Sequence, residues 1–500
     1  MNTTVQARAV SQAATGIAGL DDILAGGLAR DRLFLFEGSP GTGKTTAALS
    51  FLRAGAAAGE RALYITLSET EAELRDSAAS HGWTLEGIQV FELAPPESLL
   101  DEQQQQSLLY SSDLELGETT RLILQAVEAA QPHRVVIDSL SEIRLLAQGS
   151  LRYRRQVLAL KHYFAKHGTT VLLLDDLTAE SQDKTVHSVA HGVVRLEELA
   201  PEYGAERRRV RVVKYRGRRF RGGFHDFTIK TGGLEVYPRL VSSEHRTDFV
   251  RTPLASNVSG LDDLLGGGHE RGSSCLILGP AGTGKSLLTV NFIAAAIARG
   301  EKAALFVFDE EKGLLVERTR ALGIDLDKLI ESGNLIMQQV DAAELSPGEF
   351  TANVRECVQQ HGIRTVVIDS LNGYQAAMPE EHYLLLHMHE LLQFLNRQGA
   401  TTFLTVAQHG LVGDMKAPVD VTYLADTVLL LRYFEAAGEV RRAISVIKKR
   451  AGQHEKTIRE YSISDSGLNV GPPLTEFQGV LRGVPNFVGP GAGLMGDASA

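Results

Sequence analysis

The chain has 500 residues, a formal net charge of −10 and a sequence pI near 5.9, which disfavours a surface that attracts nucleic acid or an anionic membrane by overall charge. Hydrophobic residues make up 43% and charged residues 22%, a composition typical of globular rather than disordered proteins. Because 500 residues exceed the size of one usual core, two domains of about 250 residues are expected.

The cysteine content and the hydropathy pattern bear on the cell compartment. Only Cys275 and Cys357 occur, without CxxC spacing, so neither a disulfide framework nor a zinc site is predicted. The N-terminal residues lack a basic stretch followed by an apolar run, and no segment approaches about 18 consecutive apolar residues, so neither export nor membrane spanning is predicted. The expected location is the reducing cytoplasm.

The first half of the chain alternates short apolar runs with helical patterns. After TGIAGLDDILAGGL at 15–28, the run RLFLFEG at 32–38 predicts a strand that leads into a Gly-rich loop and an Ala- and Leu-rich helix. RALYITL, RVVIDSL and TTVLLLDD follow as runs short enough for buried strands. Alternating strands and helices predict an α/β fold, with a mostly parallel sheet flanked by helices.

The second half repeats the first. SNVSGLDDLLGGGH at 256–269 matches the opening of the first copy, and Lys285 matches Lys44 at an offset of 285 − 44 = 241. At the VVIDSL runs the offset is 369 − 138 = 231, and a longer surface loop at Pro95 to Gly117 is expected to account for the difference.

This repeat predicts a division into residues 1–245, residues 246–475 and a flexible tail, 476–500. The seam is expected in the polar stretch 238–253, which is bounded by prolines.

Each copy contains a GxxxxGK[ST] loop between a predicted strand and a predicted helix. Such loops curl the backbone so that N–H groups face phosphate oxygens, and the lysine reaches the β and γ phosphates of a nucleotide such as ATP. The predicted nucleotide-binding residues are Gly38, Ser39, Pro40, Gly41, Thr42, Gly43, Lys44, Thr45 and Thr46 in the first copy, and Gly279, Pro280, Ala281, Gly282, Thr283, Gly284, Lys285, Ser286 and Leu287 in the second.

Hydroxyl and carboxyl groups beside these loops predict a Mg²⁺ site in each copy. Thr45 and Ser286 can offer a hydroxyl, and Asp138 and Asp369 end the VVID runs, where a carboxylate would lie beside the phosphates.

A further carboxylate is needed to deprotonate the attacking water, and Glu69 and Glu310 follow the next predicted strand. The sequence therefore predicts ATP hydrolysis with Mg²⁺ as cofactor.

The GLDD openings, both loops, both VVID runs and a late Arg-rich hairpin together resemble the KaiC family, within the KaiC and RadA branch of the RecA-like ATPases. The resemblance spans nearly the whole chain. It implies two tandem RecA-like P-loop NTPase domains, and a homo-hexameric double ring with ATP held between neighbouring subunits. It also implies that KYRG at 214–217 and KKRAG at 448–452 act across the subunit seam, through Lys214 with Arg216 and Lys448 with Arg450.

The resemblance further implies autophosphorylation of the second domain. Where the family has a Ser-Thr pair, this chain has Thr422 and Tyr423, and Thr422 is the favoured acceptor. Where many members have consecutive glutamates, this chain has Ser68 and Glu69 in the first copy and Asp309 and Glu310 in the second, so the first domain either hydrolyses slowly or uses Glu69.

Two other functions fit parts of the sequence. The stretch 206–222, with eight arginines, is typical of a DNA-dependent recombinase or helicase, but the acidic chain and the absence of a recognisable DNA-binding module disfavour nucleic acid. A nucleotide-gated scaffold that assembles without turnover is the third possibility. As partners, the resemblance implies regulators of the KaiB type or a two-component kinase.

Overall fold

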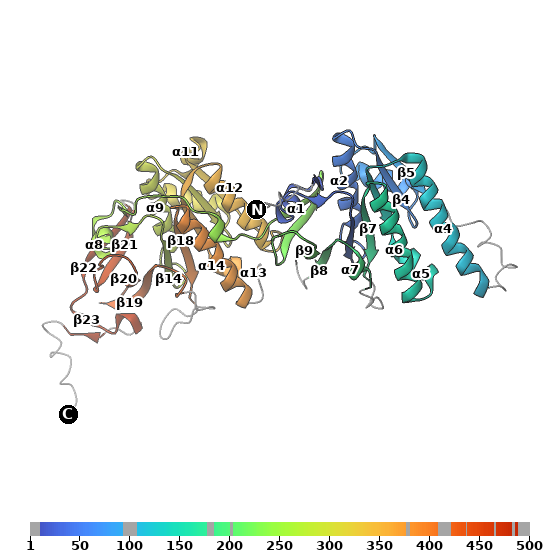
Figure 1. Ribbon diagram of the computed structural model, residues 1–500. Helices are drawn as coiled ribbons and strands as arrows, with labels where there is room; N and C mark the ends of the chain where they lie inside the picture. Colours follow the sequence, from blue (N-terminus) through green and yellow to red (C-terminus); the bar gives the residue numbers. More distant parts are fainter. Residues whose placement is uncertain are drawn as a thin grey trace, which may run out of the picture. The chain divides into compact units, whose positions relative to one another are not determined.

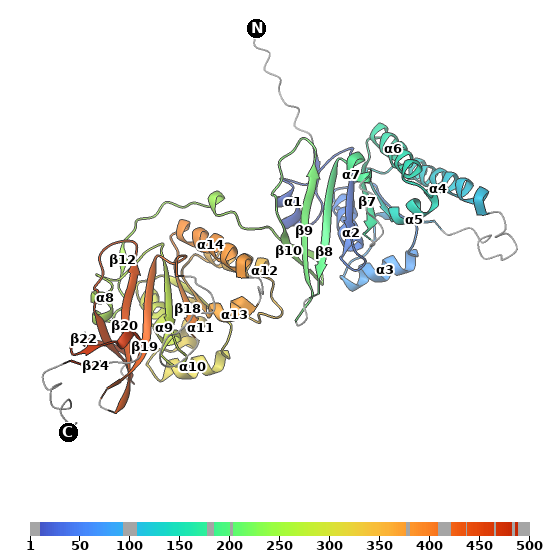
Figure 2. The ribbon, with the colours of Figure 1, turned by 90° about the horizontal axis from the view of Figure 1, so that it is seen from below.

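The structure is a computed structural model that describes residues 11–93, 108–177, 185–200, 204–376, 381–408, 422–436, 438–464, 467–482 and 486–488. The chain divides into two compact units, Met1–Arg239 and Leu240–Ala500. Figures 1 and 2 show that each unit consists of a sheet with helices on both of its faces.

The first unit is built on one nine-stranded sheet in the order β11-β10-β9-β8-β3-β7-β6-β4-β5. The strands from β8 to β5 in this order pair in parallel, and β9, β10 and β11 extend the sheet with antiparallel pairs. The strands are β3 (Leu33–Gly38), β4 (Ala62–Thr66), β5 (Ile88–Glu92), β6 (Arg134–Asp138), β7 (Thr170–Asp176), β8 (Gly192–Leu199), β9 (Arg207–Tyr215), β10 (His225–Lys230) and β11 (Gly233–Tyr237). The helices are α1 (Ala18–Ile23), α2 (Lys44–Ala57), α3 (Glu71–Ser80), α4 (Leu108–Ala130), α5 (Leu140–Ala147), α6 (Ser150–Lys166) and α7 (Thr185–Val189), and β1 (Gln12–Ala13) pairs with β2 (Leu28–Ala29).

The second unit repeats this topology. Its sheet runs β22-β21-β20-β19-β14-β18-β17-β15-β16, with the same change from parallel to antiparallel pairing at β19. The strands are β14 (Ser274–Gly279), β15 (Lys302–Val307), β16 (Leu335–Gln339), β17 (Ile363–Asp369), β18 (Thr401–Ala407), β19 (Thr427–Ala436), β20 (Glu439–Lys449), β21 (Ile458–Ser464) and β22 (Gly467–Pro473), and β12 (Pro253–Leu254) pairs with β13 (His269–Glu270). The helices are α8 (Ser259–Leu264), α9 (Lys285–Ala298), α10 (Lys312–Arg320), α11 (Leu326–Glu331), α12 (Pro347–Gln359), α13 (Leu371–Ala376) and α14 (Glu381–Arg397), with the short 3₁₀ turns η3 (Ser242–Glu244) and η4 (Val480–Arg482). The predicted fold class is confirmed.

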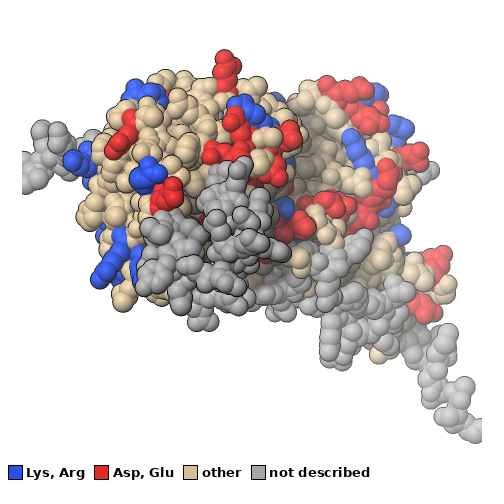
Figure 3. Space-filling view, turned by 90° about the vertical axis from the view of Figure 1, so that its right-hand side faces the viewer, with Lys and Arg blue, Asp and Glu red and all other residues tan. Residues whose placement is uncertain are grey.

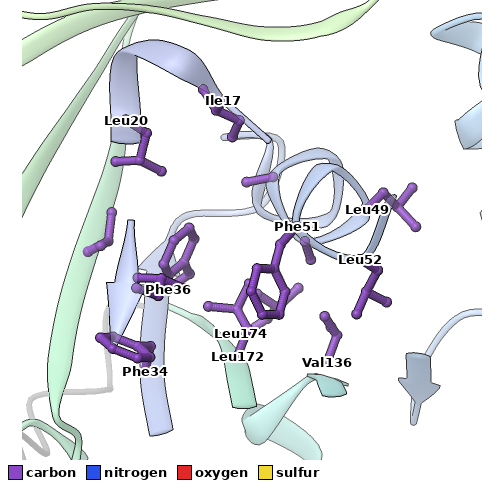
Figure 4. Close-up of a cluster of buried hydrophobic side chains, with 14 of the residues drawn as sticks. Ile17, Leu20, Phe34, Phe36, Leu49, Phe51, Leu52, Val136, Leu172 and Leu174 are labelled. Atoms are coloured by element: carbon purple, nitrogen blue, oxygen red, sulfur yellow. The ribbon is translucent and has the colours of Figure 1, made fainter. Parts of the chain in front are cut away.

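The central strands are buried on both faces because helices cover both sides of the sheet. Along β3, Phe34 and Phe36 join a cluster that packs on α2, whereas Leu33 and Leu35 join the cluster under α4, α5 and α6. This alternation follows from the two-residue period of a strand. Figure 4 shows the first cluster, with Phe51 and Leu52 of α2 directed at the sheet.

The repeated GLDD sequence has a structural explanation in both units. A Cβ on Gly19 would lie 2.0 Å from the carbonyl oxygen of Val236, and one on Gly260 would lie 2.3 Å from that of Val470, so only glycine permits this contact of α1 with β11 or of α8 with β22. The first aspartate then binds the backbone, because Asp21 Oδ1 accepts from the Thr15 N–H at 2.8 Å.

The loop predicted at Pro95 to Gly117 is partly wrong, because α4 already begins at Leu108; residues 94–107 lie outside the described residues. Leu116, Ile123 and Val127 are buried at helical spacing, which explains why the chain is helical there. The matching helix α12 has 13 residues against 23 in α4, so the longer first copy is largely a longer helix.

The predicted tail begins with a packed segment. β23 (Phe477–Gln478) pairs with β24 (Asn486–Phe487), and Val480 is fully buried against Phe434 and Ala443. Among the helices that the structure describes, none combines the length and hydropathy that a membrane span requires.

Candidate functional site

The first Gly-rich loop joins the carboxyl end of β3 to the amino end of α2. Gly43 precedes the helix with a φ of 89°, a conformation that glycine adopts without strain. Lys44 is 7% exposed, and its ammonium group donates to the carbonyl oxygens of Gly38 at 2.9 Å and Ser39 at 2.8 Å. The lysine thus lies across its own loop, at the edge where the parallel strands end.

The second loop repeats this geometry in detail. Gly284 precedes α9 with a φ of 93°, and Lys285 donates to the carbonyl oxygens of Gly279 at 3.0 Å and Pro280 at 2.8 Å. Burial lowers the pKa of Lys285, while the nearby carboxylate of Asp369 opposes this shift. The structure therefore brings both sequence-predicted loops into one arrangement, with the basic side chain and the helix N-terminus on the same side.

Asp138 and Asp369 end strands β6 and β17, close to the loops in each sheet. The hydroxyl of Thr45 donates to Asp138 Oδ2 at 3.3 Å, so two of the predicted Mg²⁺ ligands are in contact. Burial raises the pKa of Asp138, although hydrogen bonds from Tyr64 and Thr45 oppose the shift. Ser286 holds the position in α9 that Thr45 holds in α2.

No group of three His, Cys, Asp or Glu side chains within the described ranges could hold a metal by itself. One carboxylate and one hydroxyl fit a Mg²⁺ that takes its other ligands from phosphates and water.

Each aspartate is held by a hydroxyl that sequence reasoning missed. Tyr64 of β4 donates to Asp138 Oδ2 at 2.5 Å, whereas in the second unit the hydroxyl of Thr405 in β18 donates to Asp369 Oδ1. The two donors come from strands on opposite sides of the aspartate strand. The available signal was a hydroxyl side chain within a run that is expected to form a buried strand, ALYIT or TTFLTVA.

The predicted catalytic acids differ between the units. Glu69 is half-buried, and burial together with the charges of Asp138, Glu73 and Asp176 raises its pKa. In the second unit, Asp309 accepts a hydrogen bond from the Ser370 hydroxyl beside Asp369, while Glu310 forms an ion pair with Arg318 at 2.9 Å. Asp309 is therefore joined to the residue that follows Asp369, whereas Glu310 is joined to Arg318 of helix α10.

Sequence reasoning also missed Asp176 at the end of β7. Its carboxylate lies 2.8 Å from the ammonium of Lys44. The pair of aspartates that ends TTVLLLDD was the signal, because two acids at the carboxyl end of a buried strand are unusual in an apolar sheet.

The K-x-R elements bind carbonyl groups of their own chain. Lys214 donates to the carbonyl oxygens of His187 and Ala190, and Arg216 to that of Ser188. In the second unit, the same contacts join Lys448 to Thr422 at 2.9 Å and Ala425 at 2.8 Å, and Arg450 to Tyr423 at 2.7 Å. Each basic pair thus fastens the segment that precedes β8 or β19. Their predicted action on a neighbouring subunit stays a prediction.

The two candidate phosphorylation sites lie within this fastened segment. Tyr423 is 52% exposed, and Thr422 is half-buried. By the equivalence of these contacts, Thr422 and Tyr423 correspond to His187 and Ser188 of the first unit.

The arginine-rich stretch 206–222 forms β9 and the turn that follows it. Arg208 pairs with Glu198 at 2.9 Å and Arg209 with Glu197 at 2.8 Å, both across to β8. Arg211 lies over the ring of Phe224. Two of the eight arginines in this stretch are therefore paired with acids of the neighbouring strand. On the separate face drawn in Figure 3, acidic and basic side chains of the described residues are interspersed.

Comparison with known proteins assigns both halves of the chain to the same family. The family described as "ATPase: KaiC" matches residues 13–241 and 254–475. The chain is 28% identical to "Circadian clock protein KaiC3" of Synechocystis sp., over 95% of this chain and 94% of that protein. It is 27% identical to "Circadian clock oscillator protein KaiC" of Acaryochloris marina, over 96% and 92% of the two chains, and 28% identical to the protein of that name in Prochlorococcus marinus, over 96% of each.

Removal of the hydroxyl that donates to Asp138 or to Asp369 should weaken nucleotide binding only at the site that contains that aspartate. Tyr64→Phe is expected to weaken Mg²⁺-dependent ATP binding at the first site about fivefold, because Asp138 loses its short hydrogen bond. Thr405→Val should do the same at the second site through Asp369. Calorimetric titration with and without Mg²⁺, with the other site disabled at Lys285 or Lys44, measures each effect. Equal effects of either variant on both sites would contradict the assignment.

Proposed function

The chain belongs to the KaiC family of ATPases, and we propose that each of its halves binds ATP at its Gly-rich loop and hydrolyses it. The observation that carries this proposal is the repeated lysine geometry. Lys44 and Lys285 each begin a helix after a glycine of positive φ. The ammonium group of each lysine donates hydrogen bonds to two carbonyl oxygens of its own loop. We assign residues 1–245 and 246–475 to the two catalytic domains and 476–500 to a tail.

The residues around each loop support the steps of hydrolysis. Loop N–H groups and the lysine would bind the phosphates, and Thr45 with Asp138, or Ser286 with Asp369, would hold Mg²⁺, which neutralises phosphate charge when bound.

In the first site Glu69 would take the proton from water, since its raised pKa makes it a stronger base than an ordinary glutamate. In the second site Asp309 has this role, because the ion pair with Arg318 withdraws Glu310.

We propose that the active form is a hexameric double ring with ATP between neighbouring subunits. Membership of the KaiC family supports an oligomer, and the K-x-R pairs would supply the cations that such a seam needs. Lys214 with Arg216, and Lys448 with Arg450, would then stabilise the charge of the neighbour's phosphates, which makes hydrolysis depend on assembly.

We further propose autophosphorylation in the second domain, with Thr422 as the acceptor. Thr422 and Tyr423 belong to a segment held by Lys448 and Arg450, the residues assigned to the seam. A threonine hydroxyl lies closer to the backbone than a tyrosine phenol, which favours Thr422 where the family has its acceptor pair. The proposal covers phosphate transfer within the ring and does not extend to a daily rhythm.

ATP turnover should require the two loop lysines. Lys44→Ala and Lys285→Ala are each expected to remove the turnover of their own site, and the double variant should lose at least about a hundredfold, because the phosphates lose their fixed cation. Steady-state phosphate release measures this, with the exposed Lys302→Ala as a matched control. Unchanged turnover in the double variant would show that both sites are wrongly assigned, and normal assembly with no turnover in the unmodified chain would favour a scaffold.

The seam assignment predicts complementation between two inactive chains. In a Lys44→Ala background, chains with Lys285→Ala and chains with Arg450→Ala should each be inactive. Their mixture should recover up to about a quarter of the turnover, because a random ring creates seams with both residues intact. Native mass spectrometry with and without ATP checks that hexamers form and mix. Mixed hexamers without recovered turnover would refute the action of Arg450 on a neighbour.

Incubation with ATP followed by mass spectrometry tests the kinase activity. Phosphate is expected on Thr422 in the unmodified chain, none in Lys285→Ala, and none at that position in Thr422→Ala. Tyr423→Phe should leave the modification of Thr422 in place. A segment that stays unmodified while ATP is hydrolysed would remove the kinase activity and leave the ATPase.

A further inference from the structure

The strand beside each loop ends differently in the two units, at a position that in the first unit contacts the loop lysine. In the register of the sheets, Gly38 pairs with Asp176 and Gly279 pairs with Ala407. The next residues make the same backbone hydrogen bond, because Leu177 donates to Gly38 and Gln408 to Gly279, each at 3.1 Å. Asp176 and Ala407 therefore occupy equivalent positions, one charged and one apolar.

Asp176 is paired with the loop lysine, a cation that a bound phosphate would also need. Its Oδ1 lies 2.8 Å from Lys44 Nζ, with the lysine side chain 8% exposed and the aspartate side chain 31% exposed. The preceding residue, Asp175, pairs instead with Arg144.

Glu37 at the end of β3 is also neutralised by other residues. It pairs with His187 at 2.6 Å and Arg195 at 2.7 Å. Of the three acids that end β3 and β7, Asp176 is thus the one that the structure pairs with the loop lysine.

We propose, on the basis of the proposed ATPase function, that Asp176 lowers the affinity of the first site for nucleoside triphosphates. Asp176 would be a residue that sets affinity, and not a group that takes part in the reaction.

Two physical effects act in the same direction. A triphosphate must replace the carboxylate on Lys44, so part of the attraction between lysine and phosphate is spent on breaking an existing ion pair. The carboxylate also stays beside the bound phosphates, where Asp138 and Glu69 already add negative charge, and like charges repel at this range. In the second site, the hydrogen bonds that Lys285 would give up to reach a phosphate are those to two neutral carbonyls.

The two halves allow a reciprocal test. With Lys285→Ala in place only the first site binds, and Asp176→Asn should tighten binding of a non-hydrolysable ATP analogue with Mg²⁺ about tenfold. With Lys44→Ala in place only the second site binds, and Ala407→Asp should weaken it about tenfold, whereas the uncharged Ala407→Asn should not. Calorimetric titration gives both constants, and thermal melting checks that each variant folds.

Three results would overturn the inference. The first is unchanged or weaker binding by folded Asp176→Asn, and the second is equal binding by Ala407→Asp and Ala407→Asn. The third is a loss of affinity in Asp176→Asn that occurs only with Mg²⁺, because Asp176 would then be a metal ligand. If neither background bound nucleotide at all, the proposed function itself would fail, which distinguishes the two failures.

Discussion

Both halves of the molecule depend on the position of a lysine ammonium at the carboxyl edge of a parallel sheet. The strand ends, a Gly-rich loop turns back, and a helix begins at Lys44 or Lys285, so that the cation, the first helical N–H groups and the last strand carbonyls meet in one place. Since all neighbouring parallel strands end at the same edge, whatever polar residue each carries there joins the same site. Asp138, Asp176 and Glu69 are brought to the first lysine in this way.

The duplicated scaffold therefore fixes where chemistry can occur and leaves the residues at the strand ends free to differ. The aspartate of the first site is held by Tyr64 and that of the second by Thr405, from opposite sides. The first lysine forms an ion pair with Asp176, whereas the second has Ala407 at the equivalent position and donates to the carbonyls of Gly279 and Pro280. Two sites of one topology thus have different electrostatic environments, which gives the two halves of the chain a reason to behave differently.

The fold and the loops could be predicted from the sequence because their signals are local. A GxxxxGK[ST] stretch between an apolar run and an Ala-rich run specifies strand, loop and helix within some twenty residues, and its repetition gives the second unit. The contacts that distinguish the sites are not local. Tyr64 and Asp138 lie far apart in sequence and meet only through the pairing of β4 with β6. Asp176 reaches Lys44 only because β7 lies beside β3. The helix that begins at Leu108 was missed because the polar, Gln-rich sequence before it favoured a loop, although the buried residues of the helix follow at helical spacing.

The basic pairs link the two roles proposed for the second unit. Lys448 and Arg450 donate to the carbonyls of Thr422 and Tyr423 in their own chain. In the proposed ring, an ammonium or guanidinium that turned toward the phosphates of a neighbouring subunit would give up these backbone contacts. The segment with the acceptor hydroxyl would then be held less firmly when the seam is occupied. Under the proposed assembly, nucleotide binding at the seam and the fastening of the acceptor segment would therefore compete for the same two cations. The first unit has the same contacts, from Lys214 and Arg216 to the carbonyls before β8, but has His187 at the position of Thr422.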